Sequence, residues 1–448
     1  MHRYFDIDEL AYLYWASHMS MGLKPYIDFL FYPAPGFFSL LVPIVSVFQG
    51  IAVFAAARWA MLIVFASLSI ATMLLFWELR RSWVVVFIPL LFVFLPLPSD
   101  KFIEIRLDTL ATVLFTFGLW LQMRMMNGKK NMSFLAGLLY GASLAVSQKM
   151  LLPVGIAFLA SVFRREAKGM LGGICIVGLG ILLYVLSLGN FPMIWYSLTK
   201  LSFEVSNLGK LFPISPQFFF LQNDVIYGTG GFHIGYWLNL ALWSFGLCMG
   251  IIRLFTQPLL SILFLSSFLT FGYFLPMKHA QYLIVPAVFV VFYVADGIWE
   301  LWMYVKRTIV GHMIFFVGCC IMFFFLWRGY SIVTMPKLYW TNEDDIQKAE
   351  YIWKTIPKTE PIFDMVGLTM KYPQPYIAPV YPIGQMAPLI SYPLPSLSEA
   401  LEKTNTKYIY SGPAARFTTL STEDQEYIQA QYYKVLDGTL WVRNDVEY

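Results

Sequence analysis

Three acidic side chains lie within four residues near the start of a very apolar chain: Asp6, Asp8 and Glu9. Charged groups beside lipid are costly, so their presence next to a membrane usually marks a functional site. Neighbouring carboxylates can orient a hydroxyl group and remove its proton. Acids at the start of a helix can also serve only to balance the helix dipole. The cluster is therefore a candidate general base, with this plainer interpretation left open.

Further charged side chains are predicted to lie near the same membrane surface. They are Asp28, Arg58, Glu104, Arg106, Asp108, Lys149, Lys278 and His279. Lysine and histidine can hold a phosphate and stabilise the negative charge that develops as it leaves. Plainer interpretations are an ion pair between Arg106 and Asp108, and a Lys149 side chain that extends to the membrane surface. Together, the acids and bases suit an amphiphile with an anionic head group.

The composition indicates that these residues belong to a membrane protein. Of the 448 residues, 58% are hydrophobic and 13% are charged, and the mean hydropathy is +0.63. Soluble proteins have about a quarter charged residues. The formal net charge of +4 is small, and nothing in the sequence suggests nucleic-acid binding. A soluble protein is therefore excluded.

Apolar runs of about 15 to 25 residues predict the membrane-spanning helices. They lie near 54–78, 84–98, 108–125, 132–147, 150–164, 169–188, 232–252, 258–275, 281–303 and 308–327. The runs are continuously apolar and lack the alternation of barrel strands, so helices are favoured. We therefore expect an α-helical polytopic membrane protein with about ten transmembrane helices. Residues 34–50 are expected to form an interfacial or re-entrant helix, with a further span as the alternative.

The distribution of Lys and Arg predicts the orientation of these helices. Eleven cations would lie at five turns on the cytoplasmic side: Arg80, Arg81, Arg124, Lys129, Lys130, Arg164, Arg165, Lys168, Arg253, Lys306 and Arg307. The short loops on the other side contain fewer. By the positive-inside rule, both ends of the chain are expected outside the cytoplasm.

The chain is predicted to have three parts: a first outer acidic loop with an interfacial helix (1–53), a transmembrane helical domain (54–328) and a small extracytoplasmic α/β domain (329–448). In the last part, polar residues recur regularly and the charge content is ordinary. Its signals are an acidic helix start after Asn342, strand-like runs at 361–364 and 408–410, a helix cap at Ser421 and a hairpin turn at Asp437-Gly438.

Several motifs resemble those of the GT-C membrane glycosyltransferases, the relatives of protein O-mannosyltransferases and lipid A aminoarabinose transferases. The first loop carries Asp8-Glu9-x-x-Tyr12-x-x-x-Ala16-x-x-Met19-x-x-Gly22, followed by Pro25-Tyr26-x-Asp28 and Pro33-x-Pro35-Gly36. The later motifs are Ala57-Arg58, Arg106-x-Asp108, Gln148-Lys149 and Lys278-His279-x-Gln281-Tyr282-x-x-x-x-Pro286. Their order covers roughly residues 5–330. This resemblance implies a GT-C-like fold.

The resemblance also implies a reaction. A sugar on a polyprenyl-phosphate donor would pass, with inversion, to a glycan, lipid or protein acceptor on the outer face of the membrane. Asp8 would be the catalytic base, assisted by Glu9, and Asp108 the second acid. The other implied roles are donor-phosphate binding by Lys278, His279, Arg58, Lys149 and Arg106, and substrate binding by Asp28 and Tyr282. A divalent metal ion is a possible cofactor, because metal dependence differs within the superfamily.

No apolar helix precedes Asp6 in this sequence, although the acidic loop must lie outside the cytoplasm. Either the short N-terminal segment crosses the membrane unaided, or the complete protein has one more upstream helix and eleven spans; we favour the second. The compact chain, with few long loops, favours the bacterial inner membrane, with the active site and C-terminal domain outside the cytoplasm.

Three other functions compete with this prediction. A transporter should have charges near the bilayer midplane and often inverted repeats, whereas these charges are predicted at one surface. A lipid-linked polysaccharide ligase or polymerase should have a large outer loop rich in Arg and His, and residues 189–230 are poor in both. A receptor that binds ligand through its C-terminal domain would leave the acids of the first loop unexplained.

Overall fold

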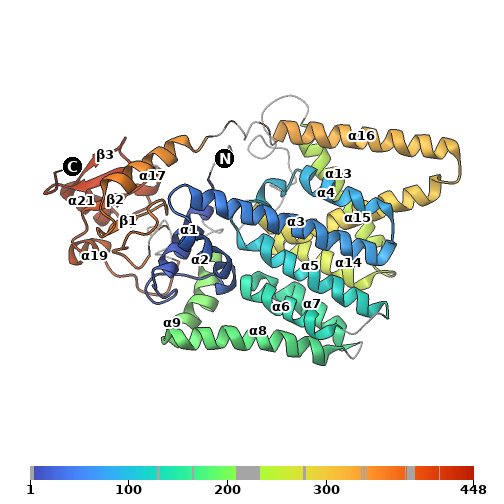
Figure 1. The fold of residues 1–448 in the computed structure, drawn as a ribbon, viewed down its shortest axis with the longest axis horizontal. Coiled ribbons are helices and arrows are strands. Elements are labelled where there is room, and N and C mark those ends of the chain that lie inside the picture. Colours follow the sequence, from blue (N-terminus) through green and yellow to red (C-terminus); the bar gives the residue numbers. More distant parts are fainter. Residues whose placement is uncertain are drawn as a thin grey trace. The chain divides into compact units, whose positions relative to one another are not determined.

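The computed structural model describes residues 5–128, 132–163, 166–207, 233–275, 279–333, 335, 339, 341–378, 380, 389–412 and 414–447. The chain divides into two compact units (Figure 1). Unit 1 contains Met1–Arg58, Leu182–Phe212 and Thr341–Tyr448, and unit 2 contains Trp59–Ile181 and Pro213–Trp340. The three-part division expected from the sequence stays a prediction.

Unit 2 is helical, and every predicted apolar run contains a helix. The helices are α3 (Ala52–Arg80, which begins in unit 1), α4 (Phe87–Phe94), α5 (Leu107–Met126), α6 (Ser133–Val146), α7 (Leu151–Val162), α8 (Ala167–Leu188, which ends in unit 1), α13 (Ile234–Ile252), α14 (Pro258–Leu269), α15 (Ile284–Val305) and α16 (Ile309–Val333). Five described helices are long and apolar enough to cross a membrane: Ala52–Arg80, Ala167–Leu188, Ile234–Ile252, Ala280–Val305 and Ile309–Ile332. The count of about ten spans stays a prediction.

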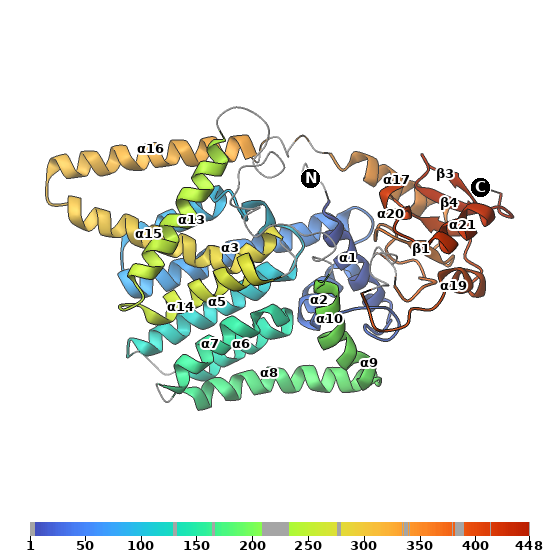
Figure 2. The same ribbon diagram turned by 180° about the vertical axis from the view of Figure 1, so that it is seen from behind.

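Helix α15 forms the centre of unit 2. Its residues from Ile284 to Asp296 are all buried, and it packs against α4, α5, α13, α14 and α16 (Figures 1 and 2). A helix that is apolar on all sides is typical of a protein core or of a membrane span. The buried carboxylate of Asp296 forms ion pairs with Arg80 and, at 2.8 Å, with Arg253. These cations offset the cost of burying its charge.

Glycines allow α6 and α8 to pack closely in unit 2, and Figure 2 shows the two helices side by side. A Cβ atom at Gly137 would meet the backbone of Met170, and one at Gly173 would meet the backbone of α6 at Phe134. Small residues at such crossings are typical of membrane helices, because their packing depends on close backbone approach.

We expect Gly137→Ala to destabilise this packing by about 1–3 kcal/mol, because a backbone atom, rather than a flexible side chain, would have to move. Gly155→Ala is the matched control, since a Cβ at Gly155 on α7 meets nothing within 4 Å and alanine favours helix. Thermal unfolding in detergent measures both variants. Equal melting temperatures would contradict the prediction.

Unit 1 combines short helices with a small sheet. Its N-terminal and middle segments form α1 (Ile7–Ser20), α2 (Phe38–Val47), α9 (Phe191–Trp195) and α10 (Ser202–Ser206). Its C-terminal segment forms α17 (Glu343–Thr355), β1 (Ile362–Asp364), α19 (Leu397–Lys403), β2 (Tyr408–Tyr410), α20 (Ala414–Phe417), α21 (Thr422–Gln431), β3 (Tyr432–Val435) and β4 (Leu440–Arg443). The predicted strands, helix starts and hairpin are confirmed. Helix α2 is shorter than the ~20 residues that a membrane crossing needs.

The sheet has the order β1-β2-β4-β3, in which β1 and β2 are parallel and the other pairs antiparallel. Phe363, Ile409 and Trp441 lie in register across it and are buried. The same apolar core includes Leu30 from the first loop and Leu201, which lies just before α10. The backbone N–H of Leu30 also donates to the carbonyl of Ile377 at 2.6 Å. The three segments of unit 1 therefore share one core.

Candidate functional site

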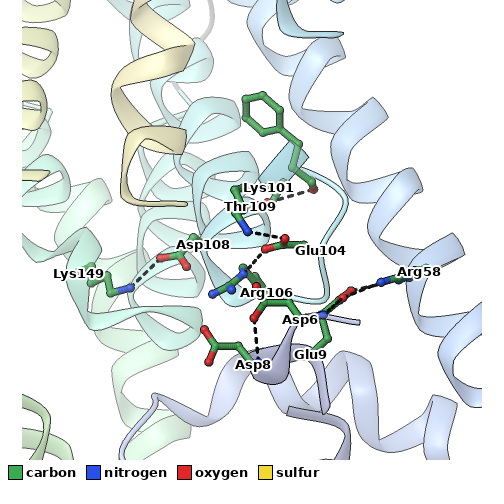
Figure 3. A network of polar contacts seen from close by, with 11 residues as sticks. Asp6, Asp8, Glu9, Arg58, Lys101, Glu104, Arg106, Asp108, Thr109 and Lys149 are labelled. Carbon is green, nitrogen blue, oxygen red and sulfur yellow. Dashed lines mark hydrogen bonds and ion pairs between the residues drawn. The ribbon is translucent and has the colours of Figure 1, made fainter. Parts of the chain in front are cut away.

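The acids of the first loop are fixed by the start of α1. Asp6 is the N-cap residue: its carboxylate accepts from the N–H of Asp8 at 3.0 Å, and the Glu9 carboxylate accepts from the N–H of Asp6 at 3.0 Å. This capping box satisfies backbone donors that a helix start would otherwise leave unpaired. Asp6 thus has a structural role, while Asp8 lies half-buried in the first helical turn (Figure 3).

Glu9 and Arg58 form a buried pair within unit 1. The Glu9 carboxylate is fully buried and accepts from Arg58 Nε at 3.2 Å and Nη2 at 2.7 Å (Figure 3). The guanidinium also lies 4.8 Å from the centre of the Phe5 ring. A two-point pair of this kind fixes orientation as well as distance. It attaches α1 to the beginning of α3, and the donor-phosphate role of Arg58 stays a prediction.

The C-terminal segment also holds α1. Asp364 at the end of β1 accepts from the N–H groups of Val366 and Gly367, each at 2.7 Å, and from Thr369. These bonds shape a loop whose Gly367 has φ +97, where a Cβ would lie 2.9 Å from the Leu10 carbonyl oxygen. Only glycine allows so close an approach in this conformation. The helix that bears Asp8 is therefore supported by the C-terminal segment of the same unit.

Burial also affects His18, at the other end of α1. Its side chain is fully buried, and Nδ1 lies 2.9 Å from the Tyr14 carbonyl oxygen. Burial lowers the pKa of His18 to about 4, because desolvation disfavours the charged imidazolium. His18 is therefore neutral at physiological pH and part of the packing of α1.

In unit 2, the acids around the start of α5, Glu104 and Asp108, form ion pairs with different cations. Glu104 is fully buried and accepts from Lys101 Nζ at 2.7 Å and from Arg106 Nε. Asp108 accepts from Lys149 Nζ at 3.0 Å (Figure 3). Arg106 thus pairs with Glu104, an acid to which the sequence motifs assign no separate role. The spacing Glu104-x-Arg106 before the helix was the available signal.

Further contacts join three loops of unit 2. The Lys149 ammonium lies 4.1 Å from the centre of the Tyr282 ring, a favourable cation–π distance. The rings of Tyr282 and His279 are 5.6 Å apart. The structure therefore brings together Asp108, Lys149, Tyr282 and His279, which the sequence motifs had selected separately. Lys278 lies outside the described residues.

Asp28 lies in unit 1 and closes a turn. Its carboxylate accepts from the N–H of Lys24 at 2.6 Å, and its carbonyl accepts from Gln374 Nε2 at 3.2 Å. Its side chain is exposed. These contacts account for an acid at this position, and its role in substrate binding stays a prediction.

Within the described part of the chain, no group of three or more His, Cys, Asp and Glu side chains could hold a metal ion. The acids that the motifs select include Glu9 and Asp108, whose carboxylates are bonded to Arg58 and Lys149. Each is thereby compensated by a protein cation. The metal ion implied by the resemblance therefore stays a prediction.

No protein-family model and no curated protein matches this sequence. Solved structures of archaeal oligosaccharyltransferases do. The Archaeoglobus fulgidus oligosaccharyltransferase tethered to an acceptor peptide has a TM-score of 0.55 at 12% identity, over 99% of this chain and 70% of that one. The enzyme AglB from the same organism, with an inhibitory peptide and a dolichol-phosphate, has a TM-score of 0.54 at 13% identity, over 99% and 71%.

A third structure, the oligosaccharyltransferase complex with Zn and sulfate, has a TM-score of 0.51 at 12% identity, over 98% of this chain and 70% of that one. At such low identity these likenesses concern the fold alone. The five apolar helices and the likeness to a membrane enzyme identify an integral membrane protein. The chain therefore has the fold of these oligosaccharyltransferase structures, as expected from the resemblance of its sequence motifs.

Proposed function

We propose that this protein transfers a sugar from a polyprenyl-phosphate-linked donor to an acceptor on the outer face of the membrane, with inversion at the anomeric carbon. One observation supports this most: Asp108, Lys149, Tyr282 and His279 come from three separate loops and are in contact in unit 2. A helical scaffold alone does not require acids and bases to meet in this way, and buried charges in membrane proteins usually serve function.

In the proposed reaction, Asp8 accepts the proton of the acceptor as the acceptor oxygen forms a bond to the anomeric carbon. The bond between that carbon and the phosphate oxygen breaks, and the phosphate leaves with the electron pair. Attack opposite the leaving group gives inversion. Lys149, His279 and Lys278 stabilise the phosphate charge as it develops. Asp108 orients Lys149 through their ion pair.

The archaeal structures support the classes of substrate. Those proteins are described with an acceptor peptide and with a dolichol-phosphate. We accordingly propose a lipid donor and place protein first among the acceptors. One of those structures contains Zn, so a divalent metal ion belongs among the assay components. We further propose that the catalytic residues and C-terminal segment lie outside the cytoplasm, in a bacterial inner membrane.

The test is an assay of the purified protein in liposomes with labelled polyprenyl-phosphate sugars and three acceptors: a hydroxyl-rich peptide, a lipid and a glycan. We expect labelled product and an equal amount of polyprenyl phosphate from at least one combination. Intact donors in all combinations, with and without divalent metal, would refute the proposal. Flux of a substrate across the same liposomes would then identify a transporter.

A further inference from the structure

Unit 1 contains a cavity of about 190 Å³ that the proposed transfer does not use. It lies among α1, the α2–α3 connection, the end of α17 and the loop around residue 370. Part of its wall is apolar and comes from Val45, Val53, Trp353 and Met370. The volume exceeds the ~150 Å³ that holds benzene in an engineered cavity. A small chemical group can therefore enter it.

Two lysines, Lys358 and Lys371, also line the cavity. In the described part of the chain, neither ammonium has a carboxylate within the 4.0 Å of an ion pair. Instead, Lys358 Nζ lies 4.2 Å from the centre of the Tyr372 ring and 5.7 Å from that of Trp353. Two neighbouring cations without an acid repel each other, and an anion between them would remove this cost.

The charge of Lys358 responds to this environment. Partial desolvation and the neighbouring Lys371 lower the pKa of Lys358, whose side chain is otherwise exposed, to about 8. Lys371 itself has φ +67, a conformation that is uncommon for a long side chain and that often occurs at ligand sites. The shared cavity lining and the effect of Lys371 on Lys358 indicate that the two ammonium groups lie near one another.

A third observation is the hydroxyl of Ser17, which lines the same cavity. Ser17 is fully buried, and its Oγ has no hydrogen-bond partner among the described residues. Leaving a buried hydroxyl unpaired costs about 1–3 kcal/mol. An oxygen atom of a ligand in the cavity would accept its hydrogen bond.

We propose that this cavity binds a phosphate monoester, with the phosphate oxygens between Lys358 and Lys371 and its organic part against the apolar wall. A phosphate monoester carries about −1.5 to −2 charges at pH 7 and so matches two ammonium groups, whereas a carboxylate would leave one uncompensated. It also supplies an acceptor oxygen for Ser17. The phosphate could belong to a lipid or to a soluble metabolite.

Calorimetric titration of the whole protein in detergent tests this site, with hexyl phosphate as the apolar probe and glycerol phosphate as the polar one. We expect hexyl phosphate to bind, and Lys358→Gln and Lys371→Asn each to weaken binding by about tenfold, because a bond between charged groups is lost. Lys354→Gln is the control. Lys354 lies four residues before Lys358 in the sequence, its side chain is 77% exposed, and it does not line the cavity.

Stronger binding of hexyl phosphate than of glycerol phosphate would support a lipid source. Equal binding of both would support a soluble source and still confirm the site. Failure of both probes to bind, or equal weakening by Lys354→Gln, would overturn the proposal. Since binding is read directly, these outcomes are independent of whether the protein transfers a sugar.

Discussion

Asp8→Asn is expected to lower the rate of sugar transfer by about 100-fold or more, the effect of removing a general base. Asparagine has nearly the same shape as aspartate but cannot accept the proton. The variant keeps the backbone N–H of residue 8, which donates to Asp6, so the capping box stays intact. Transfer of labelled sugar at saturating donor and acceptor measures the effect.

The control separates catalysis from the plainer interpretation of Asp8 as a partner of the helix dipole. Asp344 lies in the first turn of α17, as Asp8 does in that of α1, and its side chain is 73% exposed. Asp8→Asn and the control Asp344→Asn should each cost about 0.3–1 kcal/mol of helix stability. Only Asp8→Asn should abolish transfer. Transfer within about twofold of the parent rate would exclude Asp8 as the base, and Asp108 would become the next candidate.

The helices of unit 2 could be predicted because their signal is local. A continuous apolar run must satisfy its own backbone in lipid, and a helix does so within the run. The predicted run at 169–188 corresponds to α8, and that at 281–303 to α15 with the turn before it. The same reasoning explains the capping box at Asp6, since its two partners are three residues apart.

Local spacing indicates only one of the ion pairs of unit 2. Arg106 is the residue before α5, and Glu104 is two residues earlier in the same loop. Glu104 therefore lies beside Arg106, whereas Asp108 is already inside the helix. The partner of Asp108 is Lys149, 41 residues away, and no local spacing indicates such a contact.

The contacts between α1 and the C-terminal segment join residues that are more than 300 positions apart in the sequence. The N–H of Phe5 donates to Asn342 Oδ1 at 2.6 Å, and Gly367 lies against Leu10. The sequence analysis treated these segments as separate parts, because hydropathy and turn signals describe only neighbours along the chain. The core that these segments share in unit 1 therefore supports the helix that carries the candidate base.

Glu9→Gln is expected to destabilise α1 by about 3–5 kcal/mol, the usual cost of leaving one partner of a buried ion pair without the other. The Arg58 guanidinium would keep its contact with Phe5 but lose the carboxylate that compensates its charge. Arg58→Met should have a similar effect, because Glu9 is fully buried. Hydrogen exchange of the α1 amides in nanodiscs measures both.

The double variant Glu9→Gln/Arg58→Met decides what the pair does. If its role is to attach α1 to α3, the double variant should recover most of the lost protection, because no buried charge remains unpaired. The control Asp344→Asn breaks the exposed pair with Lys348. It should change the hydrogen-exchange protection of the α1 amides by about 0.5 kcal/mol or less. Full protection of α1 in both single variants, with loss of transfer only for Arg58→Met, would contradict the structural role. Arg58 would then act on the donor phosphate instead, and that role would not depend on Glu9.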